Sequence, residues 1–174
     1  PTRVVFVPGP PRPTTGIISY GDVMDEHLPP GTLTLPEMLK AGGFHLADVG
    51  KLFPRSDYAE KHYGAFDRLE FYQKPPGWTG PDPMLKFPPV RNRNPDPAPK
   101  DEKSREYRDW RRRHSDRYGD SGKTWEEEGD YRMAATAAAI IRDHAKTGAR
   151  FFLSVSQSRP HTPLTVPQQF LKMY

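Results

Sequence analysis

Apolar positions gather in two parts of the chain, residues 1–53 and 131–174, and a long polar stretch separates them. Residues 44–49 and 151–157 are short apolar runs that end near glycine or proline, a pattern typical of buried strands. A helical pattern precedes each run. Two helix-then-strand units of the same sense predict parallel strands with helices packed on the faces of one sheet, which is an α/β fold.

The first helix has a clear start signal. Thr34 is the predicted N-cap, Pro36 lies in the first turn where its missing N–H costs nothing, and Glu37 completes a capping box. Leu35, Met38 and Leu39 form the predicted apolar stripe. Gly42 and Gly43 end the helix, since glycine tolerates the backbone conformation of a helix terminus.

The second helix is predicted from Asp130, as its N-cap, to about Lys146, with Gly148 after its end. Its predicted inward residues are Met133, Ala137, Ile140 or Ile141, and Ala145. The many alanines of this segment allow close approach to a sheet.

Residues 54–129 carry little core signal. Nine prolines fall within residues 75–99, which excludes regular structure there. Residues 101–118 fit an exposed helix whose only apolar stripe is Tyr107, Trp110 and His114. We therefore divide the chain into a first helix-then-strand segment (1–53), a long irregular excursion over the surface of the sheet (54–129) and a second helix-then-strand segment (130–174).

Composition suggests a thin core. Of 174 residues only 34% are hydrophobic, 21 are proline, and the mean hydropathy is −0.83. Because Pro1 is not an initiator residue, we expect the chain to be part of a larger domain. The sequence contains no cysteine, which excludes disulfides and thiolate chemistry within it. No apolar run approaches the roughly 18 residues of a membrane span, so we expect no membrane partner.

The net charge of +4 is concentrated in residues 105–117. Asp109 and Asp116 interrupt the arginines there, a pattern that favours a solvated helix face over a nucleic-acid contact. We expect no nucleic-acid partner, although a basic nucleic-acid-binding module remains the less favoured alternative.

The candidate chemistry is cationic. Arg159 and His161 follow the second predicted strand, and Lys51 follows the first. In open α/β sheets, ligands bind in the crevice beyond the carboxyl ends of the strands. Arg3 heads an apolar run that reads as a helical turn over residues 2–7, and a helix N-terminus offers N–H groups to an oxyanion. This set favours a sulfate or phosphate ester, whose transferred group carries negative charge that must be stabilised.

Four segments resemble the sulfatase family in the family's own order. Pro1-Thr2-Arg3 is similar to the end of the signature Cys-x-Pro-Ser/Thr-Arg, whose cysteine is converted to formylglycine. Residues 12–17 resemble the Arg-Pro-x-Thr-Thr-Gly segment that follows it, and residues 34–36 with 50–53 resemble its Thr-Leu-Pro and Gly-Lys segment. Residues 159–163 match the Arg-Pro-His-x-Pro segment of the iduronate-2-sulfatase-like branch.

The resemblance implies an alkaline-phosphatase-like sandwich and a calcium-assisted hydrolysis of sulfate esters, on a sulfated small molecule or a sulfated glycan. A hydrated formylglycine, upstream of this chain, attacks sulfur. Carried over, Arg3 positions the formylglycine, Lys51 and His161 contact the sulfate oxygens, and Arg159 shapes the substrate pocket. His161 is also placed to assist the leaving group. A periplasmic or secreted location is implied by the family alone.

The chain also departs from the family pattern. The nucleophile and the calcium-binding aspartates lie outside it, so we expect a chain that is inactive without the remainder of the sulfatase domain. Pro54 stands where the family often has a histidine, and Pro8 and Pro10 interrupt the segment after the signature. A non-catalytic sulfatase homologue or a truncated product therefore stays open as an alternative.

Overall fold

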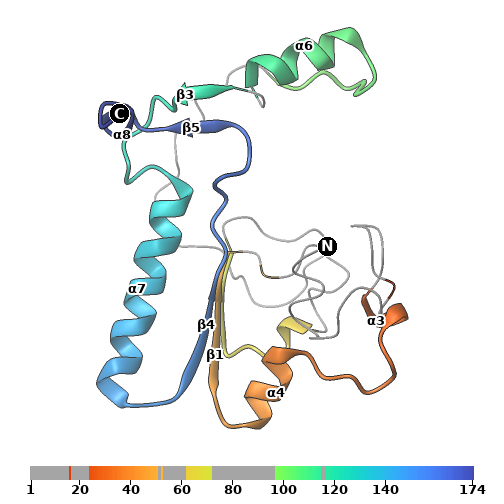
Figure 1. Ribbon diagram of the computed structural model, residues 1–174, viewed down its shortest axis with the longest axis vertical. Helices are drawn as coiled ribbons and strands as arrows, with labels where there is room; N and C mark the ends of the chain where they lie inside the picture. Colours follow the sequence, from red (N-terminus) through yellow and green to blue (C-terminus); the bar gives the residue numbers. More distant parts are fainter. Residues whose placement is uncertain (1–15, 17–23, 51, 53–61, 72–96, 115–116) are drawn as a thin grey trace. The chain divides into compact units, whose positions relative to one another are not determined.

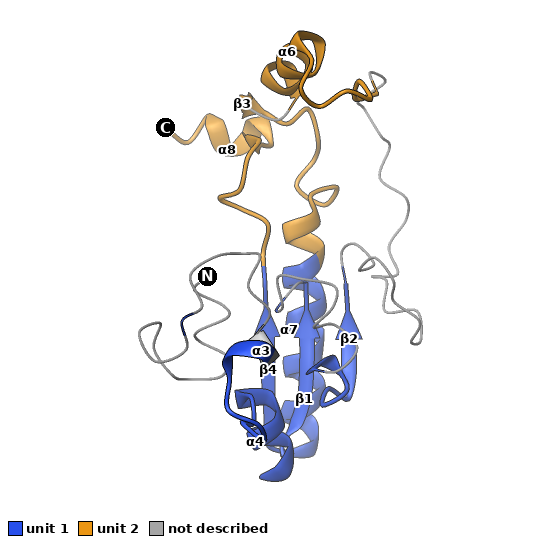
Figure 2. Cartoon of the chain, turned by 90° about the vertical axis from the view of Figure 1, so that its right-hand side faces the viewer, with its two compact units in different colours: residues 1–85, 133–156 blue, residues 86–132, 157–174 orange. Residues whose placement is uncertain are grey.

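The structure is a computed structural model that describes residues 16, 24–50, 52, 62–71, 97–114 and 117–174. It divides into two compact units, which Figure 2 distinguishes by colour. Unit 1 comprises Pro1–Leu85 and Met133–Ser156, and unit 2 comprises Lys86–Arg132 and Gln157–Tyr174. The predicted helical turn at residues 2–7, the candidate residues Arg3 and Lys51, and most of the proline-rich stretch lie outside the described residues.

Unit 1 is built on three parallel strands in the order β2-β1-β4. The strands are β1 (His45–Val49), β2 (Arg68–Glu70) and β4 (Phe151–Val155). The helices α4 (Leu35–Ala41) and α7 (Gly129–Thr147) cover the two sides of this sheet (Figure 1), and a short helix, α3 (Met24–His27), precedes α4. The predicted α/β class, with parallel strands and helices on both sides, is confirmed.

The core of unit 1 lies between β1 and α7. Ala47 and Val49 pack against Met133 and Ile140. Of the two isoleucines left open by the sequence, Ile140 is the buried one and Ile141 is 48% exposed.

The inward face of α7 differs from the prediction at its end. Ala145 is exposed, because it stands five residues after Ile140 and so about 140° around the helix. His144, four residues after Ile140, continues the inward series instead, and its ring stacks on Phe151 at 4.7 Å.

The capping box of α4 forms as the sequence predicts. The backbone N–H of Thr34 donates to Glu37 Oε2 at 2.6 Å, and the backbone N–H of Glu37 donates to Thr34 Oγ1 at 3.5 Å. Pro36 is buried in the first turn. The expectation of an inward Met38 is wrong, since that side chain is 48% exposed.

Strand β2 falls inside the stretch that was expected to run over the surface. Its register pairs Ala47 with Arg68 and Val49 with Glu70. Just before and after it, Tyr63 and Phe71 are 2% and 1% exposed, with their rings in edge contact at 4.9 Å. The expectation that residues 54–129 run over the surface of the sheet missed this strand. Three residues that include two charges are too few to show the alternation of a strand.

Unit 2 contains a second, smaller parallel pair, β3 (Tyr118–Asp120) with β5 (Leu164–Val166), and the short helix α8 (Gln168–Leu171). Its longest described helix is α6 (Arg105–His114), shorter at both ends than predicted. The expected aromatic stripe forms: Trp110 lies 5.9 Å from Tyr107 and 5.0 Å from His114 between ring centroids.

A carboxylate joins α4 to the amino end of β1. Asp67 forms an ion pair with Lys40 and accepts a hydrogen bond from the backbone N–H of Leu46 at 2.9 Å. Burial of the carboxyl acts to raise its pKa, but the hydrogen bonds from Lys40 and Leu46 and the charges of Lys40 and His45 outweigh it. The pKa of Asp67 is therefore lowered from its ordinary value of 3.8.

We predict that Asp67 stabilises the fold most at neutral pH. Because the folded pKa lies below the unfolded one, this stabilisation is complete above the unfolded pKa and is lost as the pH falls through the folded pKa. Asp67→Asn should cost about 1 kcal/mol at pH 7, and the difference from wild type should vanish in strong acid. Urea unfolding at a series of pH values measures it. Asp143→Asn, at an exposed carboxylate, should leave the pH dependence of the free energy of unfolding as it is in wild type. The same pH dependence in Asp67→Asn as in wild type would contradict the assignment.

Candidate functional site

Strands β1 and β4 end side by side. The backbone N–H of Ser156 donates to Val49 O at 2.9 Å, and that of Gly50 donates to Glu70 O at 2.8 Å. Gly50 has φ of 109°, and a Cβ there would stand 2.3 Å from Ser156 O and 3.1 Å from Met133 Sδ. Only glycine fits this close approach, because the Cβ of any other residue would overlap the Ser156 carbonyl oxygen.

Asp48 lies in this edge region and was missed by the sequence interpretation. It is fully buried, one residue before the end of β1, with Ser154 of β4 as its register partner. Alternation along the strand puts it on the face opposite Ala47 and Val49, away from the α7 core. The signal in the sequence is an acid between Ala47 and Val49, in the strand that leads into Gly50.

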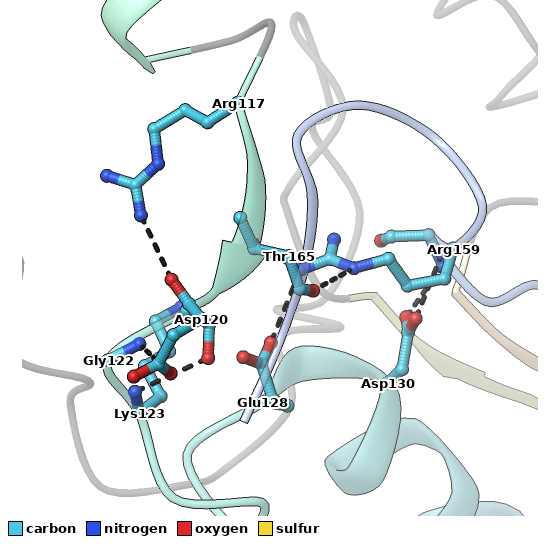
Figure 3. A network of polar contacts seen from close by, with 10 residues as sticks. Arg117, Asp120, Gly122, Lys123, Glu128, Asp130, Arg159 and Thr165 are labelled. Carbon is cyan, nitrogen blue, oxygen red and sulfur yellow. Dashed lines mark hydrogen bonds and ion pairs between the residues drawn. The ribbon is translucent and has the colours of Figure 1, made fainter. Parts of the chain in front are cut away.

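The predicted site residues Arg159 and His161 share one turn in unit 2. The backbone N–H of His161 donates to Ser158 O at 2.9 Å, which closes a four-residue turn. Asp130, in the first turn of α7, accepts the backbone N–H of Ser158 at 2.6 Å and of Arg159 at 2.9 Å (Figure 3). One carboxylate thus fixes the first half of the turn that carries His161.

The side chain of Arg159 forms a bridge within unit 2. Its Nε donates to the backbone oxygen of Thr165 at 3.0 Å, and one terminal nitrogen lies 3.5 Å from Thr165 Oγ1 and 3.5 Å from Glu128 Oε2 (Figure 3). Thr165 is 5% exposed and stands in the middle of β5. The guanidinium therefore ties the turn to β5 and to the start of α7.

His161 is exposed, with Nδ1 2.8 Å from the carbonyl oxygen of Thr162. A carbonyl oxygen only accepts hydrogen bonds, so Nδ1 carries a proton in this arrangement. The neutral ring then has its lone pair on Nε2, and only the imidazolium form donates from that atom.

The prediction that Asp130 caps α7 from outside is wrong. The helix begins one residue earlier, at Gly129, and the Asp130 carboxylate accepts the distant backbone N–H groups of Ser158 and Arg159. Glu128, the other acid of this network, was not singled out. The two hydrogen bonds of Asp130 join residues 28 and 29 positions apart, so no local sequence signal reveals them.

Among the described residues, no group of three or more histidine, aspartate or glutamate side chains is placed to hold a metal ion. The described residues therefore supply no ligand set for the calcium that the family resemblance implies. No helix within the described ranges is both long and apolar enough to cross a membrane.

The basic helix α6 has internal charge compensation. Arg105 and Arg112 each lie 3.7 Å from a carboxylate oxygen of Asp109, and their side chains are 89% and 78% exposed. This arrangement fits the solvated helix face that the interleaved charges predict.

The chain matches no protein-family model, and a search of curated proteins finds no sequence similar to it.

We predict that Gly50→Ala destabilises unit 1 strongly. The added Cβ meets the Ser156 carbonyl oxygen, which belongs to paired backbone and cannot swing aside, so the cost should be about 3 kcal/mol. Gly148→Ala is the matched control: it also has positive φ, at 68°, but nothing lies within 4 Å of its Cβ position. Its cost should be only about 1 kcal/mol. Equal losses in chemical denaturation would show that the close approach at Gly50 is not a constraint.

Proposed function

We propose that this chain is part of a sulfatase catalytic domain that hydrolyses sulfate esters. The observation that carries the proposal is the parallel, in-register pairing of β1 with β4, which brings Gly50 and Ser156 to one edge of the sheet. Lys51 follows Gly50 directly in the sequence, and the His161 turn follows Ser156. Parallel α/β sheets bind ligands at this edge, and both following segments carry cations suited to an oxyanion.

The proposal assigns His161 the acid-base role. With the Nδ1 proton donated to Thr162 O, Nε2 is the nitrogen left to exchange a proton with substrate. As imidazolium, Nε2–H can donate to a sulfate oxygen or to the leaving-group oxygen. After that proton is transferred, the neutral ring keeps the same tautomer, because Nδ1–H still donates to the carbonyl.

By the family resemblance, Lys51 contacts the sulfate oxygens and Arg3 positions the formylglycine upstream of this chain. Arg159 shapes the pocket through the turn backbone, since its guanidinium already binds Thr165 and Glu128. We also propose that the complete domain has the alkaline-phosphatase-like sandwich fold, with the β2-β1-β4 sheet as one part of it. The substrate class is a sulfated small molecule or sulfated glycan, and calcium belongs only to the complete domain.

The complete product of the gene, coexpressed with a formylglycine-generating enzyme, should hydrolyse a chromogenic aryl sulfate. Lys51→Ala and His161→Ala should each lower kcat/KM at least about 100-fold, the usual loss when one charge-stabilising donor is removed. Steady-state kinetics measures this. Lys146→Ala, which removes an exposed lysine of α7 that pairs with Asp143, is the control and should retain full activity.

Two results would contradict the proposal. Near-normal rates in both the Lys51 and His161 variants would remove their roles, and hydrolysis by the 174-residue chain alone would refute the upstream nucleophile. A complete product that binds sulfate without turnover would instead identify the chain as a non-catalytic sulfatase homologue.

A further inference from the structure

We propose that Asp130 is a positioning residue for His161, and that it acts by fixing the backbone from which the imidazole projects. The inference rests on the proposed function for the role of His161. The link itself is a set of contacts within unit 2, and it can be tested with no catalysis.

The geometry gives each carboxylate oxygen one backbone partner. Oδ1 accepts from Ser158 N–H at 2.6 Å and Oδ2 accepts from Arg159 N–H at 2.9 Å. Ser158 and Arg159 are the first two residues of the turn, and Ser158 O accepts the N–H of His161 at 2.9 Å. Asp130 is therefore separated from the His161 backbone by one residue and two hydrogen bonds.

A carboxylate suits this position for a chemical reason. Two N–H groups on consecutive residues need two acceptors, and hydrogen bonds to an ionised acceptor are about twice as strong as neutral ones. An amide at residue 130 has only one oxygen, and its NH₂ group would face a second N–H donor. Asp130→Asn should therefore release one of the two turn residues.

The side chain of Arg159 gives the turn a second attachment. Arg159 donates to Thr165 in β5, so the residues between them, His161 included, form a short loop held at both ends. Asp130 holds the entry to this loop from α7. The two attachments bracket the segment in which His161 Nδ1 lies 2.8 Å from Thr162 O.

The experiment uses the ¹⁵N-labelled chain and two readouts in wild type, Asp130→Asn and Asp130→Ala. Amide hydrogen exchange at Ser158 and Arg159 should be slow in wild type and at least about tenfold faster in Asp130→Ala. Long-range ¹H–¹⁵N spectra of the His161 ring should show the Nδ1–H tautomer in wild type. In both Asp130 variants they should show a mixture of the two tautomers.

The matched control is Asp143→Ala, which removes an exposed carboxylate from the same helix. It should leave both readouts unchanged, and so separate the position of the charge from its mere presence on α7. Unprotected amides at Ser158 and Arg159 in wild type would overturn the inference. So would an unchanged His161 ring spectrum in Asp130→Ala, because the carboxylate would then hold the turn without orienting the imidazole.

A kinetic arm connects the inference to the proposed activity. In the complete gene product, Asp130→Ala should lower kcat about tenfold with little change in KM, because a misplaced imidazole impairs proton transfer more than ground-state binding. Absence of sulfatase activity in wild type refutes the proposed function and leaves the spectroscopic result standing. Normal kcat in an Asp130 variant with an altered ring spectrum refutes the positioning role alone.

Discussion

The in-register parallel pairing of β1 and β4 is the constraint on which unit 1 depends. Five residue pairs, from His45 with Phe151 to Val49 with Val155, align two segments that are about a hundred residues apart in the sequence. The alignment presents Ala47, Val49 and Leu153 to α7 as one apolar face. It also makes the two strands end together, so that the segments following them leave from one edge of the sheet. Gly50 is the tightest point of this arrangement, because its backbone passes the Ser156 carbonyl oxygen with no space for a side chain.

Unit 2 is organised by charge where unit 1 is organised by apolar packing. Its small parallel pair, β3 with β5, is too short to bury a large core. Asp130 and Glu128 compensate by holding the backbone and side chain of Arg159, and Arg159 in turn holds Thr165. An arginine that the sequence offers as an anion ligand is thus largely engaged within the protein, whereas the His161 side chain of the same turn is exposed.

Local chemistry was predictable and long-range chemistry was not. The capping box of Thr34 and Glu37 was readable because both partners lie within one helical turn. The parallel α/β class followed from two repeated helix-then-strand patterns. Strand β2 was missed because three residues, two of them charged, are too few to show the alternation of a strand. The contacts of Asp130 were missed because its partners lie 28 and 29 residues away. The turn residues Arg159 and His161 were predicted together and do share one turn, whereas Arg3 and Lys51 lie outside the described residues.

A sulfate titration of the ¹⁵N-labelled chain tests most directly whether His161 is the anion-contacting residue of this turn. We expect sulfate to shift the Nε2 resonance of His161 in a saturable titration, because the exposed ring can donate to a sulfate oxygen from that atom. Sulfate-induced shifts confined to the arginines of α6, with the His161 ring unaffected, would contradict this assignment.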